Sequence, residues 1–222
     1  MQPSPRRPPK CSWKSGAVLP DTGRVLVIGC GALARELVAV VGHNRLDNIA
    51  IECLPARLHN TPALIPDAVE ARIVRGHHQG AIVFVAYGDC GTGGRLDAVL
   101  ERHGVDRLPG AHCYEFFMGS NDFEIEHEAE PATFYLTDFL VRHFDRLVWS
   151  GLGLDRHPQL LEAYFGNYER VLFISQQEKP SRIEAARGCA SRLGLRFEHR
   201  HAGYGAMQAA LLEINSVSSD AA

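Results

Sequence analysis

The sequence lacks any apolar run that approaches the roughly 20 residues needed to cross a lipid bilayer. Its first nine residues also lack the apolar stretch of a secretory signal. We therefore expect a cytoplasmic protein with no membrane partner. Because the cytosol is reducing, the six cysteines are expected to be thiols, metal ligands or redox centres rather than disulfides.

An excess of positive charge is also missing. The 23 basic and 26 acidic residues are interspersed and give a formal net charge of -3. Such a chain has no basic field that could gather the phosphates of a nucleic acid. We expect no nucleic-acid partner, and a small-molecule substrate or another protein instead.

The remaining composition suits one folded domain. With 222 residues and 45% hydrophobic content, the chain can form a hydrophobic core without disulfides or structural metals. Residues 1–22, which include Cys11, are rich in proline and charge and have no apolar period, which predicts a disordered lead. We expect a single α/β domain over residues 23–216 and a disordered tail over residues 217–222.

Apolar runs typical of strands buried on both faces alternate with segments of helical periodicity. Strands are expected at residues 24–29, 49–54, 81–87, 170–175 and, as an edge strand, 195–201; helices are expected at residues 32–43, 66–75, 138–149, 158–165, 181–193 and 206–214, with a further one that ends at Gly104. Ser181 and Glu184 have the spacing of a capping box at the start of one helix. The alternation predicts a doubly wound, mostly parallel sheet flanked by helices.

Two of the cysteines follow buried strands in matching positions. Cys30 and Cys90 each come directly after a strand and precede a glycine, and Cys113 lies in a later loop that could bring a third sulfur to the same sheet edge, where ligands gather. Three thiolates and an open position suit a catalytic zinc ion or an iron–sulfur cluster with one accessible iron. No Cys-x-x-Cys knuckle is present, so the fold would have to assemble this site. An apolar filler role is the alternative for each cysteine alone, and it is our interpretation of Cys53 and Cys189.

Polar side chains near the same edge are candidates for ligation or proton transfer. His59 follows the second strand, and Pro62 keeps the residues before it extended, which could aim the imidazole across the edge. His59 is thus a candidate fourth metal ligand or general base. Glu36, one turn into the first helix, and Asp89 are candidate catalytic carboxylates that orient a ligand or handle protons. A surface or capping role is the alternative for all three.

Several glycines and one aromatic residue are candidates for binding a cofactor. Gly29, Gly31 and Gly91 flank the strand-end cysteines and would let the backbone pass close to a bound group. Tyr114 could wall a pocket for a flat ligand, with plain core as the alternative. The turn over residues 91–94 could instead cradle a phosphate at a helix N-terminus. It lacks the lysine of a P-loop, and the first glycine pair lacks the third glycine of a dinucleotide fingerprint.

Five short blocks of the sequence carry a family resemblance. They are Gly29-Cys30-Gly31 with Arg35-Glu36, Leu58-His59-Asn60-x-Pro62, Tyr87-Gly88-x-Cys90-Gly91, His112-Cys113 and Thr133-Phe134-Tyr135-Leu136. With these blocks the chain resembles the bacterial and archaeal family named domain of unknown function 1638. Many relatives carry His-Asp-Cys where this chain has His-Cys, which leaves the role of His112 open. The resemblance implies a cytoplasmic protein found alongside corrinoid-dependent methyl-transfer proteins, and hence one-carbon metabolism with a corrinoid or methyltransferase protein as partner.

These features support three hypotheses from different classes. The first is a metal-dependent enzyme, in which three thiolates hold zinc or an iron–sulfur cluster and the open position binds a small-molecule substrate. Methyl transfer fits it, because zinc can lower the pKa of a bound thiol and make its sulfur nucleophilic at neutral pH. The second is a non-catalytic accessory protein that handles a metal or serves a corrinoid system. The third is a nucleotide-binding regulatory module built on the glycine turns.

Overall fold

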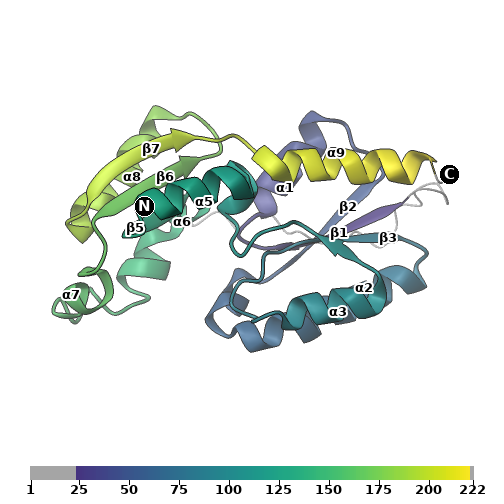
Figure 1. Cartoon of the computed structure of the whole chain (residues 1–222), viewed down its shortest axis with the longest axis horizontal. Helices are drawn as coiled ribbons and strands as arrows, with labels where there is room; N and C mark the ends of the chain where they lie inside the picture. The colour runs from purple at the N-terminus through teal and green to yellow at the C-terminus, as the bar shows by residue number, and fades with distance from the viewer. Residues whose placement is uncertain (1–23, 221–222) are drawn as a thin grey trace, which may run out of the picture. The chain divides into compact units, whose positions relative to one another are not determined.

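The computed structural model describes residues 24–220 (Figure 1). The described residues form two compact units, one from residues 24–108 with 209–220 and the other from residues 109–208. Each unit contains its own parallel sheet between helices, so the predicted α/β class with parallel strands is confirmed. The strands form two sheets, where the sequence indicated one. Cys11 and the predicted disordered lead lie outside the described residues.

The first unit is built on a four-stranded sheet. Its strands are β1 (Val25–Cys30), β2 (Ile49–Leu54), β3 (Ile82–Ala86) and the short β4 (Asp106–Arg107), in the order β2-β1-β3-β4 and parallel throughout. The central strand β1 is buried along its whole length, as its uninterrupted apolar sequence predicts for a strand covered on both faces. The carboxyl ends of β1, β2 and β3 therefore share one edge of this sheet.

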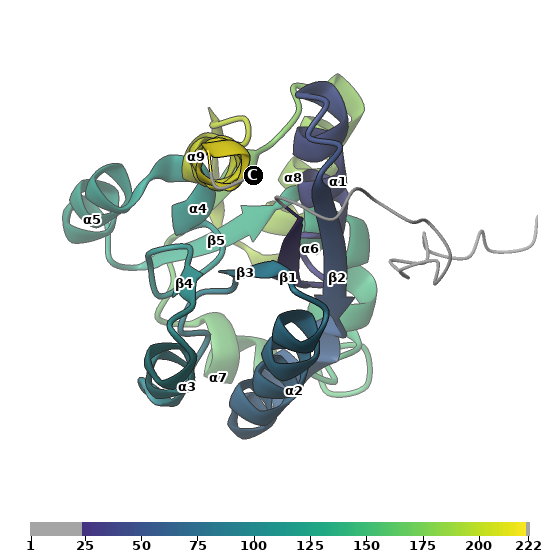
Figure 2. The ribbon, with the colours of Figure 1, turned by 90° about the vertical axis from the view of Figure 1, so that its right-hand side faces the viewer.

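Helices cover both faces of the first sheet. The helices α1 (Ala34–His43) and α9 (Gly205–Asp220) lie on one face, and α2 (Ile65–His78) and α3 (Arg95–His103) lie on the other (Figures 1 and 2). Two short 3-10 turns, η1 (Ala56–Asn60) and η2 (Pro62–Leu64), connect β2 to α2. Helix α9 runs further than predicted, so residues 217–220 of the expected tail are helical. Asn48 Nδ2 donates to Ser218 Oγ at 2.7 Å and ties this extension to the unit.

The second unit is built on three parallel strands in the order β5-β6-β7. The strands are β5 (Thr133–Thr137), β6 (Arg170–Ser175) and the edge strand β7 (Arg196–His201). The helices are α4 (Glu115–Met118), α5 (Ser120–Ala129), α6 (Asp138–Phe144), α7 (Leu160–Phe165) and α8 (Pro180–Leu193). A π-helical turn, η3 (Asp145–Trp149), continues α6. The predicted helix over residues 138–149 thus changes its winding after Phe144. Helix α8 begins at Pro180, whose ring suits a first helical position, and no side chain caps it, so the predicted Ser181–Glu184 capping box is wrong.

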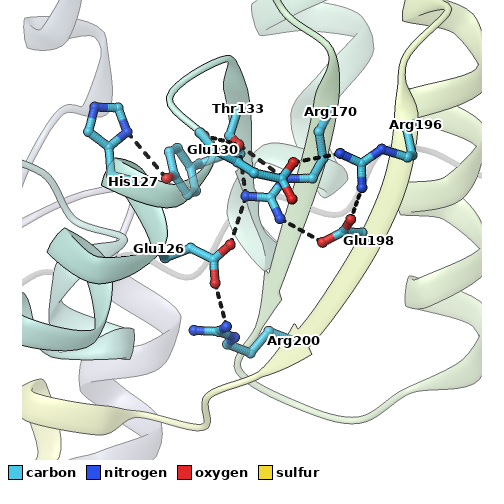
Figure 3. Close-up of polar contacts among 9 residues, drawn as sticks. Glu126, His127, Glu130, Thr133, Arg170, Arg196, Glu198 and Arg200 are labelled. Atoms are coloured by element: carbon cyan, nitrogen blue, oxygen red, sulfur yellow. Dashed lines mark hydrogen bonds and ion pairs between the residues drawn. The ribbon is translucent and has the colours of Figure 1, made fainter.

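The two faces of the second sheet are stabilised differently. One face packs its apolar side chains, including Val171 and Phe173 of β6, against α6, α7 and α8. The other face presents Arg170, which is 2% exposed, to helix α5. Its guanidinium bonds Glu126 Oε1 of α5 at 2.7 Å and Glu198 Oε2 of β7 at 2.6 Å (Figure 3). A buried ion network therefore attaches α5 to the sheet, where an apolar contact is more usual.

Candidate functional site at the carboxyl edge of the first sheet

Four side chains with ligand or proton-transfer chemistry gather where β1 and β3 end. Cys30 is the last residue of β1, and Tyr87 follows β3 directly; both are buried. His59 lies in η1, on the connection that leaves β2, and Cys90 lies in the loop between β3 and α3. Parallel pairing of the three strands places the start of these connections at one edge.

The side chains of Cys30 and His59 are in contact in this site. The Cys30 Sγ atom lies 3.8 Å from His59 Nδ1, and the same imidazole nitrogen lies 3.0 Å from the carbonyl oxygen of Ala56. The backbone N–H of Ala32 donates to the Cys30 sulfur at 3.3 Å. The Ala56 carbonyl can only accept, so His59 Nδ1 carries a proton and the lone pair lies on Nε2. The Nδ1 atom, which faces Cys30, therefore cannot take the Cys30 proton. A cysteine–histidine nucleophile activated through Nδ1 does not fit this arrangement.

Tyr87 supplies a buried hydroxyl to the same place. Its ring stacks on the His59 imidazole with centroids 6.2 Å apart and planes 14° apart. Burial raises the pKa of this phenol, and the neighbouring Cys30 thiol raises it further. The hydroxyl is fully buried and makes no hydrogen bond of good geometry to the described residues. Because a buried polar group without a partner costs about 1–3 kcal/mol, the Tyr87 hydroxyl is a candidate hydrogen-bond donor to a bound group.

Cys90 has an unusual backbone conformation. Its φ of 50° lies in the left-handed region, which non-glycine residues rarely adopt and which is often found at functional positions. Burial raises the pKa of its thiol to about 12, and the nearby Cys30 thiol acts in the same direction. The next residue, Gly91, packs on the η2 turn, since a Cβ there would lie 3.4 Å from Pro62 Cγ. The loop that carries Cys90 is therefore held against the connection that carries His59.

Neither strand-end thiol is a thiolate at neutral pH in the metal-free protein. Burial raises the pKa of Cys30 to about 11, and the hydrogen bond from the backbone of Ala32 and the nearby Tyr87 hydroxyl offset this only in part. The cysteines of this edge are therefore poor free nucleophiles, because the thiolate is the reactive form. A divalent metal would supply the positive charge that deprotonation requires.

Asp89 has a structural role. Its carboxylate accepts from Thr92 Oγ1 at 2.6 Å and from the backbone N–H groups of Gly94 at 2.9 Å and Gly93 at 3.2 Å. These hydrogen bonds, that of Thr92 first, lower the pKa of Asp89 to about 2. A carboxylate held so firmly in its ionised form is a poor proton carrier, so the expected catalytic role is not supported. The same contacts fill the turn over residues 91–94, which leaves its amides no room to cradle a phosphate.

The predicted cofactor glycines are explained by packing. A Cβ on Gly29 would lie 2.5 Å from Leu37 of α1, and a Cβ on Gly31 would lie 2.9 Å from the carbonyl oxygen of Leu54. Both positions therefore need glycine for the close approach of neighbouring elements. Gly91, with a φ of 81°, needs glycine for its left-handed turn. The three glycines thus have packing or turn roles in this fold, and a role in binding a cofactor stays a prediction.

Two other candidate side chains belong to elements next to β1: Glu36 of α1 and Cys53 of β2. Glu36 is buried in the first turn of α1, as the sequence placed it. Cys53 pairs in register with Gly29, so it points to the face of the sheet opposite Cys30. A metal at the Cys30 side would therefore not reach Cys53, in line with our interpretation that it is not a ligand.

The predicted third thiolate belongs to the second unit. Cys113 lies in the loop before α4, and the buried Glu115 carboxylate fixes this loop by accepting from the N–H groups of Ala111 and His112 at 2.9 and 3.0 Å. The Tyr114 ring stacks on Tyr135, with centroids 4.9 Å apart, and its role in a ligand pocket stays a prediction. Within residues 24–220, no three His, Cys, Asp or Glu side chains form a ready-made metal site. The structure thus brings together Cys30 and His59, and it does not by itself complete a ligand set.

Sequence reasoning missed Tyr87. It ends the apolar run Ala81-Ile-Val-Phe-Val-Ala-Tyr87 and looked like one more core residue of the strand. A signal was available, because a tyrosine at the last inward position of a buried strand places its hydroxyl at the ligand-binding edge. The resemblance also included Tyr87 in one of its blocks, without a role.

Comparison with known proteins places the chain in a family. The model of the family described as "Protein of unknown function (DUF1638)" matches residues 53–211, more than half of the chain. The matched stretch includes His59, Tyr87, Cys90 and Cys113, and it begins after Cys30. Neither the curated proteins nor the solved structures gave a match. No helix among the described residues is long and apolar enough to span a membrane. The chain belongs to the DUF1638 family, as its sequence blocks indicated.

Proposed function

We propose that the first unit binds a zinc ion at the carboxyl edge of its sheet and uses that ion to act on a small molecule. The observation that carries the proposal is the 3.8 Å separation of Cys30 Sγ and His59 Nδ1. Two ligands of one tetrahedral zinc, with a Zn–S bond of about 2.3 Å and a Zn–N bond of about 2.0–2.1 Å, lie about 3.6 Å apart. The pair therefore already has the spacing of adjacent zinc ligands. Metal binding through this nitrogen would replace its hydrogen bond to Ala56.

Cys90 is the third ligand of the proposed site. The Cys30 thiol is near enough to raise the pKa of Cys90, and the strained backbone of Cys90 lies in a loop that packs on η2. Closing the site requires a movement of the Cys90 side chain or loop toward the Cys30–His59 pair. The participation of Cys113, which belongs to the other unit, stays a prediction from the sequence.

The donor set favours zinc over an iron–sulfur cluster. One imidazole and two thiolates suit zinc, whereas a cluster is held chiefly by cysteines and this edge of the first unit offers two of them. A third protein ligand leaves the fourth position of a tetrahedral ion for a substrate, as in catalytic zinc sites. The buried Tyr87 hydroxyl, which lacks a hydrogen-bond partner among the described residues, would donate to a group in that position.

A transfer reaction to a thiol is the chemistry that we propose for this site. Zinc would lower the pKa of a substrate thiol and so make its sulfur nucleophilic at neutral pH. Methyl transfer is the specific reaction that the family resemblance suggests, with a methylated corrinoid or methyltransferase protein as the donor. A non-catalytic metal-handling protein would use the same ligands, and turnover decides between the two. A nucleotide-binding module is not supported, since Asp89 occupies the amides that would hold a phosphate.

The proposal is tested by loading the anaerobically purified full chain with cobalt in place of zinc. Thiolate ligation gives a sulfur-to-cobalt charge-transfer band in the near ultraviolet, and we expect this band in wild type. Cys30→Ser, Cys90→Ser and His59→Ala should each weaken or abolish it, while Cys53→Ser and Cys189→Ser keep it. A wild-type protein that takes up no cobalt or zinc would remove the metal proposal. Brown protein with iron and sulfide would replace zinc with a cluster.

A further inference from the structure

A second group of ligand-bearing side chains lies at the carboxyl end of the second sheet. His199 and His201 are alternate residues of the edge strand β7, so both point to the same face. In the parallel pairing with β6, His199 lies beside Phe173 and His201 lies beside Ser175. The pair is therefore presented where β6 and β7 end, the position at which parallel sheets bind ligands.

The two imidazoles converge on one atom. His199 Nε2 lies 2.9 Å and His201 Nδ1 lies 3.1 Å from the hydroxyl oxygen of Ser175. The hydroxyl carries a single proton, so it can donate to one of the two imidazoles and must accept from the other. Two imidazole nitrogens from different side chains are thus already aimed at one point.

This group does not fit a serine nucleophile. Ser175 has no exposed surface, so a substrate carbonyl could not approach its hydroxyl. The backbone N–H groups that follow it, those of Gln176 and Gln177, would have to stabilise an oxyanion. Both already donate to Asp138 Oδ2, at 3.2 and 3.3 Å. The serine therefore serves to orient the imidazoles and is not itself reactive.

The surroundings of the two histidines favour a bound cation. Asp138 and Glu178 both lie close enough to His199 for their negative charges to act on its imidazole. Asp138 is buried, and its carboxylate is engaged by the backbone and by Arg182 at 3.6 Å. Glu178 is exposed, in the loop between β6 and α8, three residues after Ser175. The negative charge of Glu178 therefore favours a cation bound at His199.

We infer that His199 and His201 form a two-imidazole binding site for a divalent transition metal, separate from the proposed cysteine site of the first unit. Two imidazoles suit zinc, cobalt, nickel or copper, and they exclude magnesium and calcium, which prefer oxygen ligands alone. A metal would draw the two imidazoles away from the Ser175 hydroxyl and together onto one ion. Its remaining positions would be open to water or an anionic ligand.

The site is tested by calorimetric titration of the full chain with nickel, in a Cys30→Ser/Cys90→Ser background that removes the thiolates of the first unit. We expect about one nickel ion per chain, with affinity reduced about tenfold or more by His199→Ala or His201→Ala and less by Glu178→Gln. His78→Ala, which removes an exposed histidine of α2, is the matched control and should leave the affinity unchanged. Ser175→Ala should also keep the site, because the hydroxyl is not a ligand.

A second readout keeps the test valid if a histidine variant folds poorly. Zinc added to the same thiolate-free background should shift or broaden the imidazole proton resonances of His199 and His201 and leave that of His78 in place. Equal nickel affinity in the histidine variants and the background would overturn the inference, and so would loss of binding in Ser175→Ala. A negative nickel result would not affect the cobalt–thiolate band, so the two experiments test the two proposed sites independently.

Discussion

Cys30 and His59 lie 29 positions apart in the chain, and their side chains meet with 3.8 Å between Sγ and Nδ1. The contact forms because β1 and β2 are parallel neighbours, which brings the end of one strand beside the connection that leaves the other. Tyr87 and the loop of Cys90 complete the surroundings from β3. The carboxyl edge of the first sheet thus combines the metal-ligand side chains Cys30 and His59 with the buried Tyr87 hydroxyl.

Tyr87→Phe should separate stability from function. Its hydroxyl makes no good hydrogen bond to the described residues. Removal of the hydroxyl should therefore either lower the free energy of unfolding by less than about 1 kcal/mol or increase it. Metal or substrate binding should weaken at the same time, because the proposed donor to the bound group is lost. Urea unfolding and cobalt titration measure the two effects. A loss of stability well above that value would show that the hydroxyl holds the fold together instead.

Asp89→Ala should destabilise the first unit by about 1–2 kcal/mol, because Thr92 and two backbone amides lose their acceptor. Asp106→Ala, which removes an exposed carboxylate near the end of the same sheet, is the control and should have a much smaller effect. The free energy of unfolding is measured in urea at neutral pH. An unchanged value for Asp89→Ala would contradict the structural role assigned to this carboxylate.

The contribution of Asp89 should also depend on pH. Its pKa is lowered from an ordinary value of 3.8 to about 2, so the folded state favours the ionised form. The stabilisation is therefore complete above pH 3.8 and is lost as the pH falls through about 2. The difference in unfolding free energy between wild type and Asp89→Asn should shrink over that range. A difference that stays constant down to pH 2 would rule out a lowered pKa.

The buried thiols should show the opposite pH dependence. Burial raises the pKa of Cys30 to about 11, so the unfolded chain ionises this thiol first. The stability of the metal-free protein should fall as the pH rises from about 9 to 11, because the folded state retains the proton. Cys30→Ala should show a smaller fall over the same range. Iodoacetamide should label Cys30 at neutral pH far more slowly than a model thiol; rapid labelling would mean that the thiol is activated.

In the second unit, Arg170→Ala should be strongly destabilising. Its guanidinium is buried and satisfies carboxylates of α5 and β7, so truncation should cost about 3–5 kcal/mol. Arg196→Ala removes a half-exposed arginine of the same network and should cost less than about 1 kcal/mol. Thermal unfolding compares the two variants. Similar losses would contradict the distinction between the buried and the exposed members of the network.

The sequence predicted the strands best where they are wholly apolar. Residues 49–54 and 170–175 form strands with the predicted bounds, and Gly104 and Gly194 end helices in the left-handed conformation. Strand β5 was missed because threonines flank its short apolar centre. Helix α5 was missed because none of its residues is fully buried and Arg170 and Arg200 of the sheet bind it through Glu126. Such support is tertiary, and local periodicity does not contain it.

The candidate site was predictable only in part for a similar reason. Cys30 and His59 were brought together by a general property of parallel sheets, the shared edge of their carboxyl ends. The roles of Gly29 and Gly31 needed their neighbours, Leu37 and Leu54, which no local pattern identifies. For Asp89 the sequence allowed proton transfer or a capping role, and its three donors favour the capping role. The division of the chain into two units was not visible in the composition either.

The most direct test of the zinc proposal is the near-ultraviolet absorption of the cobalt-loaded protein, because it reports thiolate ligation and is blind to the histidines of the second unit. We predict a charge-transfer band in wild type that is weakened or lost in Cys30→Ser and kept in Cys53→Ser, whose sulfur faces the other side of the sheet. Circular dichroism should show that removal of the metal leaves the fold intact. A cobalt-loaded wild type without this band, or a Cys30→Ser variant that retains it in full, would contradict the account.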